Sequence, residues 1–230
     1  MDISKQFSFS DFLAYFFPGA FATLGLYLIF LLSPSQDTFS NFTLDFTTGI
    51  AFLILSYIVG VILSGFSSGL VKQIEKLTKY KNPQDVIPDD LFPLEVIQRY
   101  KSMMNINKDE TFHWTRNHFR LCRSFVFHTM PVVAQKVQRH ADLGLFRRNL
   151  VVPLIIWGLA GIFWGISNLL QGFASWGSLL IILSALFSWL SINSAITRLH
   201  NSNYVETRDV LLGFIVGYNL GLQNKSSKSP

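Results

Sequence analysis

The chain has 230 residues, of which 50% are hydrophobic, 15% are aromatic and only 14% are charged, with a formal net charge of +5. Soluble proteins carry about 25% charged residues, so the composition excludes an ordinary soluble domain and favours an integral membrane protein. The single cysteine, Cys122, excludes an intramolecular disulfide.

The first apolar segment follows a short N-terminal stretch. Residues 12–36 carry no charge, and a membrane-spanning helix needs about 20 apolar residues, so we predict a span over about 12–33. This segment lacks the basic start and the cleavage site of a signal peptide, and we expect it to be retained. Pro18 lies inside it and removes the backbone hydrogen bond to the carbonyl of Ala14, which predicts a kink.

The second uncharged run covers residues 46–71 and predicts a span over about 46–68. "GLVKQIEKLTKY" continues it with helical spacing of Leu70, Ile74 and Leu77. We therefore expect the second span to extend beyond the bilayer.

Residues 72–148 form a polar insert that reads as helical almost throughout. We predict one helix ending near Met104, with Asp90 as its cap and Pro93 in its first turn. A second has Asp109 as its N-cap and places Phe112, Phe119, Cys122, Phe125 and Val126 on one face. A third begins after Pro131 and enters the next span. The insert is expected to be a small bundle of three or four helices.

The third uncharged run, residues 149–197, is long enough for two spans. The sequence "NLLQGFASWG" predicts a tight turn between spans at about 150–170 and 175–195. Beyond them, "VLLGFIVGYNLGLQ" predicts a separate interfacial or packing helix within residues 198–230.

The predicted fold class is therefore an all-α membrane protein with four transmembrane helices and a small helical domain inserted between the second and third. We expect four regions: an N-terminal transmembrane hairpin (1–71), a cytoplasmic helical domain (72–148), a second hairpin (149–197) and a cytoplasmic tail (198–230). Of the 19 Lys and Arg residues, 14 lie in 72–148 and none lies in the loops 34–45 and 171–174. Because basic residues are retained in the cytoplasm, both termini are predicted to be cytoplasmic.

Basic side chains follow one face of the helix predicted after Asp109: His113, Arg116, Arg120 and Arg123. Guanidinium groups bind phosphate and carboxylate bidentately, so this stripe is a candidate site for an anion or an acidic partner. A solvated or ion-paired helix face is the alternative. His118 and Cys122 lie four residues apart, but no further zinc ligand is evident, and we expect no metal or cofactor.

The sequence "RSFVFH", from Arg123 to His128, resembles the R-x4-6-H signature of the HEPN ribonucleases. This resemblance implies a dimeric, membrane-tethered nuclease that uses Arg123 and His128. Ser124 departs from the family, which usually has Asn, Asp or His at that position.

None of the predicted spans contains Asp, Glu, Lys, Arg or His, which argues against a proton-coupled transporter or an ion pump. Small residues in the apolar segments allow helices to approach closely. The candidates for packing or oligomer contacts are Gly60, Ser64, Gly158, Gly161, Gly165, Gly213, Gly217 and Gly221.

The layout resembles the membrane effectors or membrane subunits of bacterial anti-phage defence systems of the retron, cyclic-oligonucleotide and Kiwa types. The resemblance rests on "FSFSDFLAYFFPG", on the helical insert and on "RHADLGLFRRNLVVPL" at the return to the bilayer. It implies a homo-oligomeric inner-membrane protein without catalytic residues. A regulatory protein or nucleoprotein would trigger it to permeabilise the membrane, with no direct sequence-specific nucleic-acid binding. A passive scaffold for a soluble partner is a third alternative.

Overall fold

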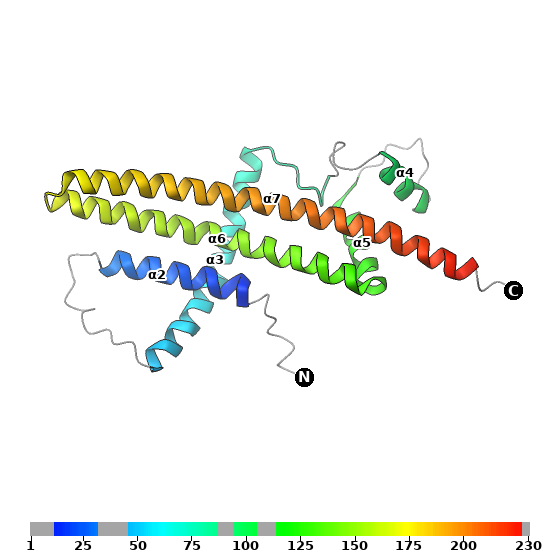
Figure 1. Ribbon diagram of the computed structural model, residues 1–230, viewed down its shortest axis with the longest axis horizontal. Helices are drawn as coiled ribbons and strands as arrows, with labels where there is room; N and C mark the ends of the chain where they lie inside the picture. The colour runs from blue at the N-terminus through cyan, green and yellow to red at the C-terminus, as the bar shows by residue number, and fades with distance from the viewer. Residues whose placement is uncertain (1–11, 32–45, 87–93, 105–113, 227–230) are drawn as a thin grey trace. The chain divides into compact units, whose positions relative to one another are not determined.

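The computed structural model describes residues 12–31, 46–86, 94–104 and 114–226 (Figure 1). Within these ranges every regular element is a helix. In chain order they are the π-helix η2 (Phe12–Phe16) and the α-helices α2 (Phe17–Leu31), α3 (Phe46–Leu77), α4 (Leu94–Met103), α5 (Arg116–Thr129), α6 (Pro131–Leu170) and α7 (Ala174–Ser226). The all-helical prediction is confirmed for the part of the chain described.

The chain divides into two compact units. Unit 1 comprises Met1–Ile74 and Leu145–Leu199, and unit 2 comprises Glu75–Gly144 and His200–Pro230. The hairpins expected at 1–71 and 149–197 thus belong to one unit, and the tail expected at 198–230 groups with the insert. Helices α6 and α7 each contribute residues to both units.

Four helical segments are long and apolar enough to cross a membrane: Phe12–Ile29, Phe46–Leu77, Pro131–Leu170 and Ala174–Asn219. They overlap the four spans predicted from the uncharged runs, and residues 32–33 of the first predicted span lie outside the described residues. The predicted turn between the last two lies at residues 171–173, where Gly172 has φ +87°. Glycine adopts this left-handed conformation without the steric cost that a Cβ would add.

The prediction of a separate helix at "VLLGFIVGYNLGLQ" is wrong, because these residues continue α7 without a break. Helix α7 has 53 residues, and no proline and no pair of neighbouring glycines interrupts it. Val210, Leu211, Phe214 and Ile215 are buried in unit 2, so this part of α7 packs in a core instead of lying in a membrane interface.

The core of unit 2 brings together α4, α5, the first part of α6 and the last part of α7. Its large buried side chains include Tyr100, Trp114, Phe119, Val126 and Phe214. Helix α5 starts at Arg116 after the N-cap Thr115, whose backbone N–H donates to Nδ1 of His118 at 3.1 Å. The cap predicted at Asp109 and the start predicted at Asp90 and Pro93 lie outside the described residues.

Unit 1 contains a polar contact at the point where Pro18 leaves the carbonyl of Ala14 without its usual helical donor. The side chain of Asn149, on α6, is buried and donates from Nδ2 to the Ala14 oxygen at 2.9 Å. The backbone oxygen of Asn149 in turn accepts from the buried hydroxyl of Ser67, on α3, at 3.4 Å. Three helices are thus joined where proline breaks the hydrogen-bond ladder, and the π-helix η2 lies at this break.

Candidate functional site

Two buried carboxylates mark the functional candidate in unit 2. Glu206 and Asp209 lie three residues apart on α7, so they share one side of the helix, and they are only 5% and 6% exposed. A buried carboxylate needs a charged or hydrogen-bonding partner to offset its lost hydration. Both have such partners.

Glu206 is held by residues from two other segments. Its Oε1 lies 3.5 Å from Nε of Arg123, on α5, and its Oε2 accepts from Nε2 of Gln84 at 3.1 Å. Burial raises the pKa of Glu206 above its ordinary value, and the Arg123 guanidinium opposes this rise. The ion pair therefore offsets part of the cost of burying this carboxylate.

The network extends beyond Glu206 along α6. Arg123 Nη2 donates to Oε1 of Gln138 at 3.5 Å, and Gln138 Nε2 donates to Oδ1 of Asp142 at 2.7 Å. The Arg123 guanidinium also lies 5.1 Å from the centre of the Phe127 ring. Arg123 thus connects α5, α6 and α7 in one polar network.

Asp209 lies close to three basic side chains. Lys136 Nζ lies 3.1 Å from Oδ2, His140 Nε2 lies 3.7 Å from the same oxygen, and Arg208 Nη2 lies 3.4 Å from Oδ1. Lys136 and His140 both come from α6, so this carboxylate joins α6 to α7 inside unit 2.

The members of the predicted basic stripe have different surroundings. Arg123 belongs to the Glu206 network, whereas Arg116 makes a half-exposed ion pair with Asp85 at 3.7 Å. Arg120 is exposed, and His113 lies outside the described residues. Among the described members of the stripe, Arg116, Arg120 and Arg123 are therefore not united in one pocket.

Arg123 and His128 likewise lie on different sides of α5. The two residues are five positions apart on α5, which rotates them by about 140° around a helix of 3.6 residues per turn. Arg123 turns toward Glu206, while His128 is exposed near the helix end. Among the described residues, no three His, Cys, Asp or Glu side chains are grouped to hold a metal.

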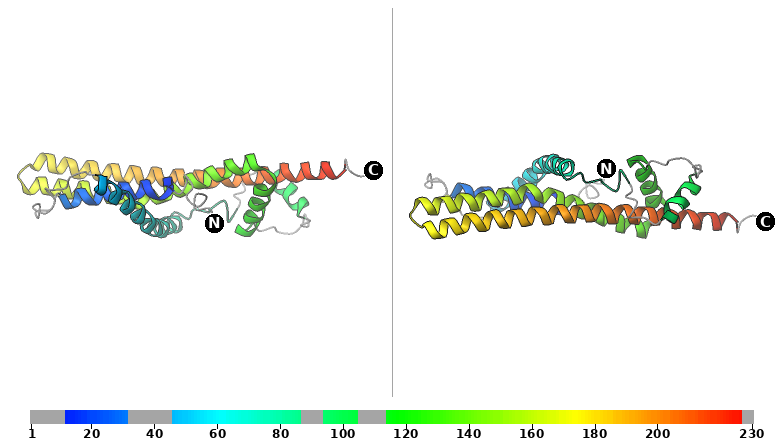
Figure 2. Two further views of the ribbon diagram at one scale, coloured as in Figure 1. Left: turned by 90° about the horizontal axis from the view of Figure 1, so that it is seen from below. Right: turned by 90° about the horizontal axis from the view of Figure 1, so that it is seen from above.

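In unit 1 the predicted small residues bring helices into close contact. A Cβ at Gly60 would overlap the carbonyl oxygen of Tyr15, and one at Gly19 would overlap that of Ser56, so η2 and α2 both touch α3 through their backbones. The contacts between α6 and α7, which lie side by side in both views of Figure 2, pair Gly158 with Ser188, Gly161 with Ser184, and Gly165 with Ile181 and Gly177.

The remaining members of the glycine set have other surroundings. In unit 2, Gly213 lies against Val133 and Val126, and Gly217 lies against Met130 and Phe125. Ser64 is half-buried on α3. The surroundings of Gly221 are outside what the structure describes.

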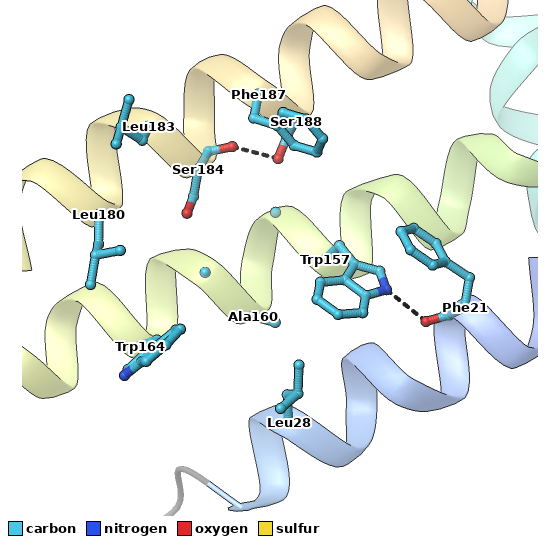
Figure 3. A pocket seen from close by; sticks show the side chains of 12 residues that line it. Phe21, Leu28, Trp157, Ala160, Trp164, Leu180, Leu183, Ser184, Phe187 and Ser188 are labelled. Atoms are coloured by element: carbon cyan, nitrogen blue, oxygen red, sulfur yellow. Dashed lines mark hydrogen bonds between the residues drawn. The ribbon is translucent and has the colours of Figure 1, made fainter.

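An apolar groove opens between α2, α6 and α7 of unit 1 (Figure 3). Its volume is about 490 Å³. Trp157 stacks on Phe21 with ring centres 4.9 Å apart, and its indole N–H donates to the Phe21 carbonyl at 2.7 Å. The other lining residues are Leu28, Gly158, Ala160, Gly161, Trp164, Leu180, Leu183, Ser184, Phe187 and Ser188.

No sequence pattern described above marks Glu206, Asp209, Gln84 or Asn149 as site residues. The available signal for the first two was "ETRD" within an otherwise apolar helical segment, because acids three positions apart share a helix face. For Asn149 the signal was its place as a polar residue at the start of the third uncharged run, directly after Arg148.

Four helices long and apolar enough to cross a membrane indicate the class of α-helical multi-pass membrane proteins. No protein-family model, no curated protein and no solved structure matches the chain.

Proposed function

We propose that the chain is an effector of a bacterial anti-phage defence system, placed in the inner membrane with both termini in the cytoplasm. In this proposal unit 2 is the cytoplasmic domain that receives a signal from a regulatory partner, and unit 1 assembles with other copies and permeabilises the bilayer. The distribution of Lys and Arg supports the orientation, since 14 of 19 fall between the second and third spans.

The observation that carries the proposal is the composition of α7. One unbroken helix contains a segment apolar enough to cross a membrane and, further on, two buried carboxylates tied to cations of α5 and α6. An event that alters those ion pairs therefore acts on the same helix that forms a span.

A switch follows from the chemistry of Arg123. An anionic ligand or an acidic partner that captures this guanidinium leaves Glu206 buried with less compensation. Breaking a buried pair by removing one partner costs about 3–5 kcal/mol, and the partial exposure of Arg123 reduces this figure. Such a cost is sufficient to shift an equilibrium between two packings of α7 against α5.

The test is inducible expression in a bacterium with a voltage-sensitive dye, with RNA integrity read from the same cultures. We expect rapid depolarisation with intact RNA. His128→Ala is the discriminating variant, because His128 is exposed and its loss leaves the buried network intact. An effector of the membrane keeps its activity in this variant, whereas a ribonuclease that uses His128 loses it.

Two results would reject the proposal. RNA degradation that precedes depolarisation and disappears in His128→Ala would assign the chain to the ribonucleases. Absence of any depolarisation, together with a companion protein that purifies with the chain in fixed ratio, would make it a membrane scaffold.

A further inference from the structure

The apolar groove of unit 1 lies well away from the charged ends of its helices. Its residues on α6, from Trp157 to Trp164, follow Arg148 by nine to sixteen positions. At a rise of 1.5 Å per residue this is about 14–24 Å along the helix. A hydrocarbon core about 30 Å thick therefore places the groove around its middle, where lipid headgroups do not reach.

The lining offers little to a polar ligand. No charged residue contributes to it. The Trp157 indole N–H is taken by the carbonyl of Phe21, and the Ser188 hydroxyl donates to the carbonyl of Ser184 at 2.6 Å (Figure 3). A ligand that needs hydrogen bonds would lose its hydration here without replacement, so the complementary occupant is a hydrocarbon.

The groove is also open toward the lipid. Trp164 and Leu183 are each 50% exposed and Phe187 is 64% exposed, whereas Ala160, at its floor, is only 4% exposed. The alkyl chain of a lipid that diffuses in the bilayer can therefore enter between the aromatic side chains and reach the buried floor of the groove. A volume of about 490 Å³ falls within the roughly 300–1,000 Å³ of ligand pockets.

We propose that this groove is a binding site for one hydrocarbon chain of a membrane lipid, held between α2, α6 and α7 near the middle of the bilayer. A helix of a second copy is the competing occupant. With its side chains such a helix is about 10–12 Å wide, whereas an alkyl chain is slender enough to reach the floor at Ala160. A bound alkyl chain supplies the dispersion contacts that the walls of an empty groove would lack.

The experiment uses tryptophan quenching by brominated lipids. Two variants of the full-length protein each keep one tryptophan, with the other four changed to Phe: one keeps Trp157, in the groove, and the control keeps Trp189, which is 63% exposed and does not line it. Both are reconstituted in phosphatidylcholine vesicles with bromine in the distal half of one acyl chain. The lipid is then exchanged for unbrominated phosphatidylcholine.

We expect both tryptophans to be quenched at first. After exchange, Trp189 should recover at the rate of the bulk lipid, and Trp157 at least about tenfold more slowly, since a factor of ten corresponds to 1.4 kcal/mol of binding. Recovery of both at the same rate would overturn the proposal. So would an unquenched Trp157 accompanied by a dimer that depends on protein concentration, which would assign the groove to a second copy.

A blocking variant provides an independent control. Ala160→Leu adds volume at the floor of the groove, while Ala185→Leu adds the same volume at an exposed position on α7 outside the lining. In the Trp157 background, Ala160→Leu should abolish the slow recovery and Ala185→Leu should retain it. Helical circular dichroism establishes that both variants are folded, and slow recovery that survives Ala160→Leu would contradict the proposal.

Discussion

Units 1 and 2 solve the packing of helices in opposite ways. In unit 1 the closest contacts join backbones through glycine and serine, as at Gly60 and Gly158. In unit 2 large side chains such as Phe119 and Phe214 form the core, and buried carboxylates link its helices through ion pairs. Lipid is as apolar as a leucine side chain, so helices in a membrane gain little from burying apolar surface and associate by close fit. In water, burial itself drives packing.

The two units also satisfy buried polar groups differently. Unit 1 uses a neutral amide, Asn149, to supply the donor that Pro18 removed. Unit 2 uses charge, with Arg123 and Lys136 facing Glu206 and Asp209. An ion pair responds to acidity and to competing anions, whereas an amide does not, so we expect the stability of unit 2 to depend on pH and salt more than that of unit 1.

The largest expected effect tests the backbone contact of unit 1. Gly60→Ala places a Cβ against the carbonyl of Tyr15, which cannot move as a side chain can, so we expect a loss of about 3 kcal/mol in the free energy of unfolding. Gly69→Ala, on the same helix with open space around it, should gain about 0.5–1 kcal/mol. Titration with sodium dodecyl sulfate, followed by circular dichroism, measures both. Equal effects would show that close fit does not hold η2 to α3.

The next effect tests the charge network of unit 2. Arg123→Ala removes the cation that faces buried Glu206. Removing one partner of a buried pair costs about 3–5 kcal/mol, and Arg123 is partly exposed, so we expect a smaller loss of roughly 2 kcal/mol. Arg116→Ala removes a half-exposed pair and should cost less than about 1 kcal/mol.

The thiol of Cys122 provides a readout specific to unit 2. It is fully buried, and burial raises its pKa to about 12. The reactive thiolate is therefore scarce in the folded protein, and alkylation reports opening of the unit. Alkylation of Cys122 should be accelerated in Arg123→Ala well beyond its rate in Arg116→Ala, and equal rates would contradict the assignment of a structural pair to Arg123 and Glu206.

A smaller effect concerns the amide that completes the broken ladder of unit 1. Asn149→Ala leaves the Ala14 carbonyl without this donor and should cost about 1–2 kcal/mol. In a Pro18→Ala background the backbone N–H at position 18 is restored, so the same change should cost less. A double-mutant cycle measures this coupling, which we expect to be at least about 0.5 kcal/mol. Additive costs would indicate that Asn149 and Pro18 act independently.

The smallest expected effect is the dependence of the stability of unit 2 on pH. The folded-state pKa of Glu206 is raised above its ordinary 4.5, chiefly by burial, so the neutral carboxyl is favoured in the fold. The contribution of this neutral carboxyl to the free energy of unfolding is complete below pH 4.5 and is lost as the pH rises through the raised pKa. The stability of the wild-type protein relative to the Glu206→Gln variant should therefore fall across that window. Detergent titrations at several pH values measure the difference, and a rise with pH would mean that Arg123 outweighs burial.

The sequence by itself determined the features that depend on local composition. Four candidate spans within three uncharged runs, the turn around Gly172 and the continuation of α3 to Leu77 all follow from hydropathy and from helical spacing. The missing backbone bond at Pro18 was likewise visible, because it depends only on the residue type and its place in a helix.

Only the tertiary structure decided which partners these features have. The donor for the Ala14 carbonyl comes from Asn149, 135 residues away, and the partner of Gln84 is Glu206, 122 residues away. Periodicity reports which face of a helix is apolar, but not which helix covers it. For the same reason a basic stripe read along α5 did not reveal that Arg123 faces a buried acid on α7 while Arg120 remains exposed.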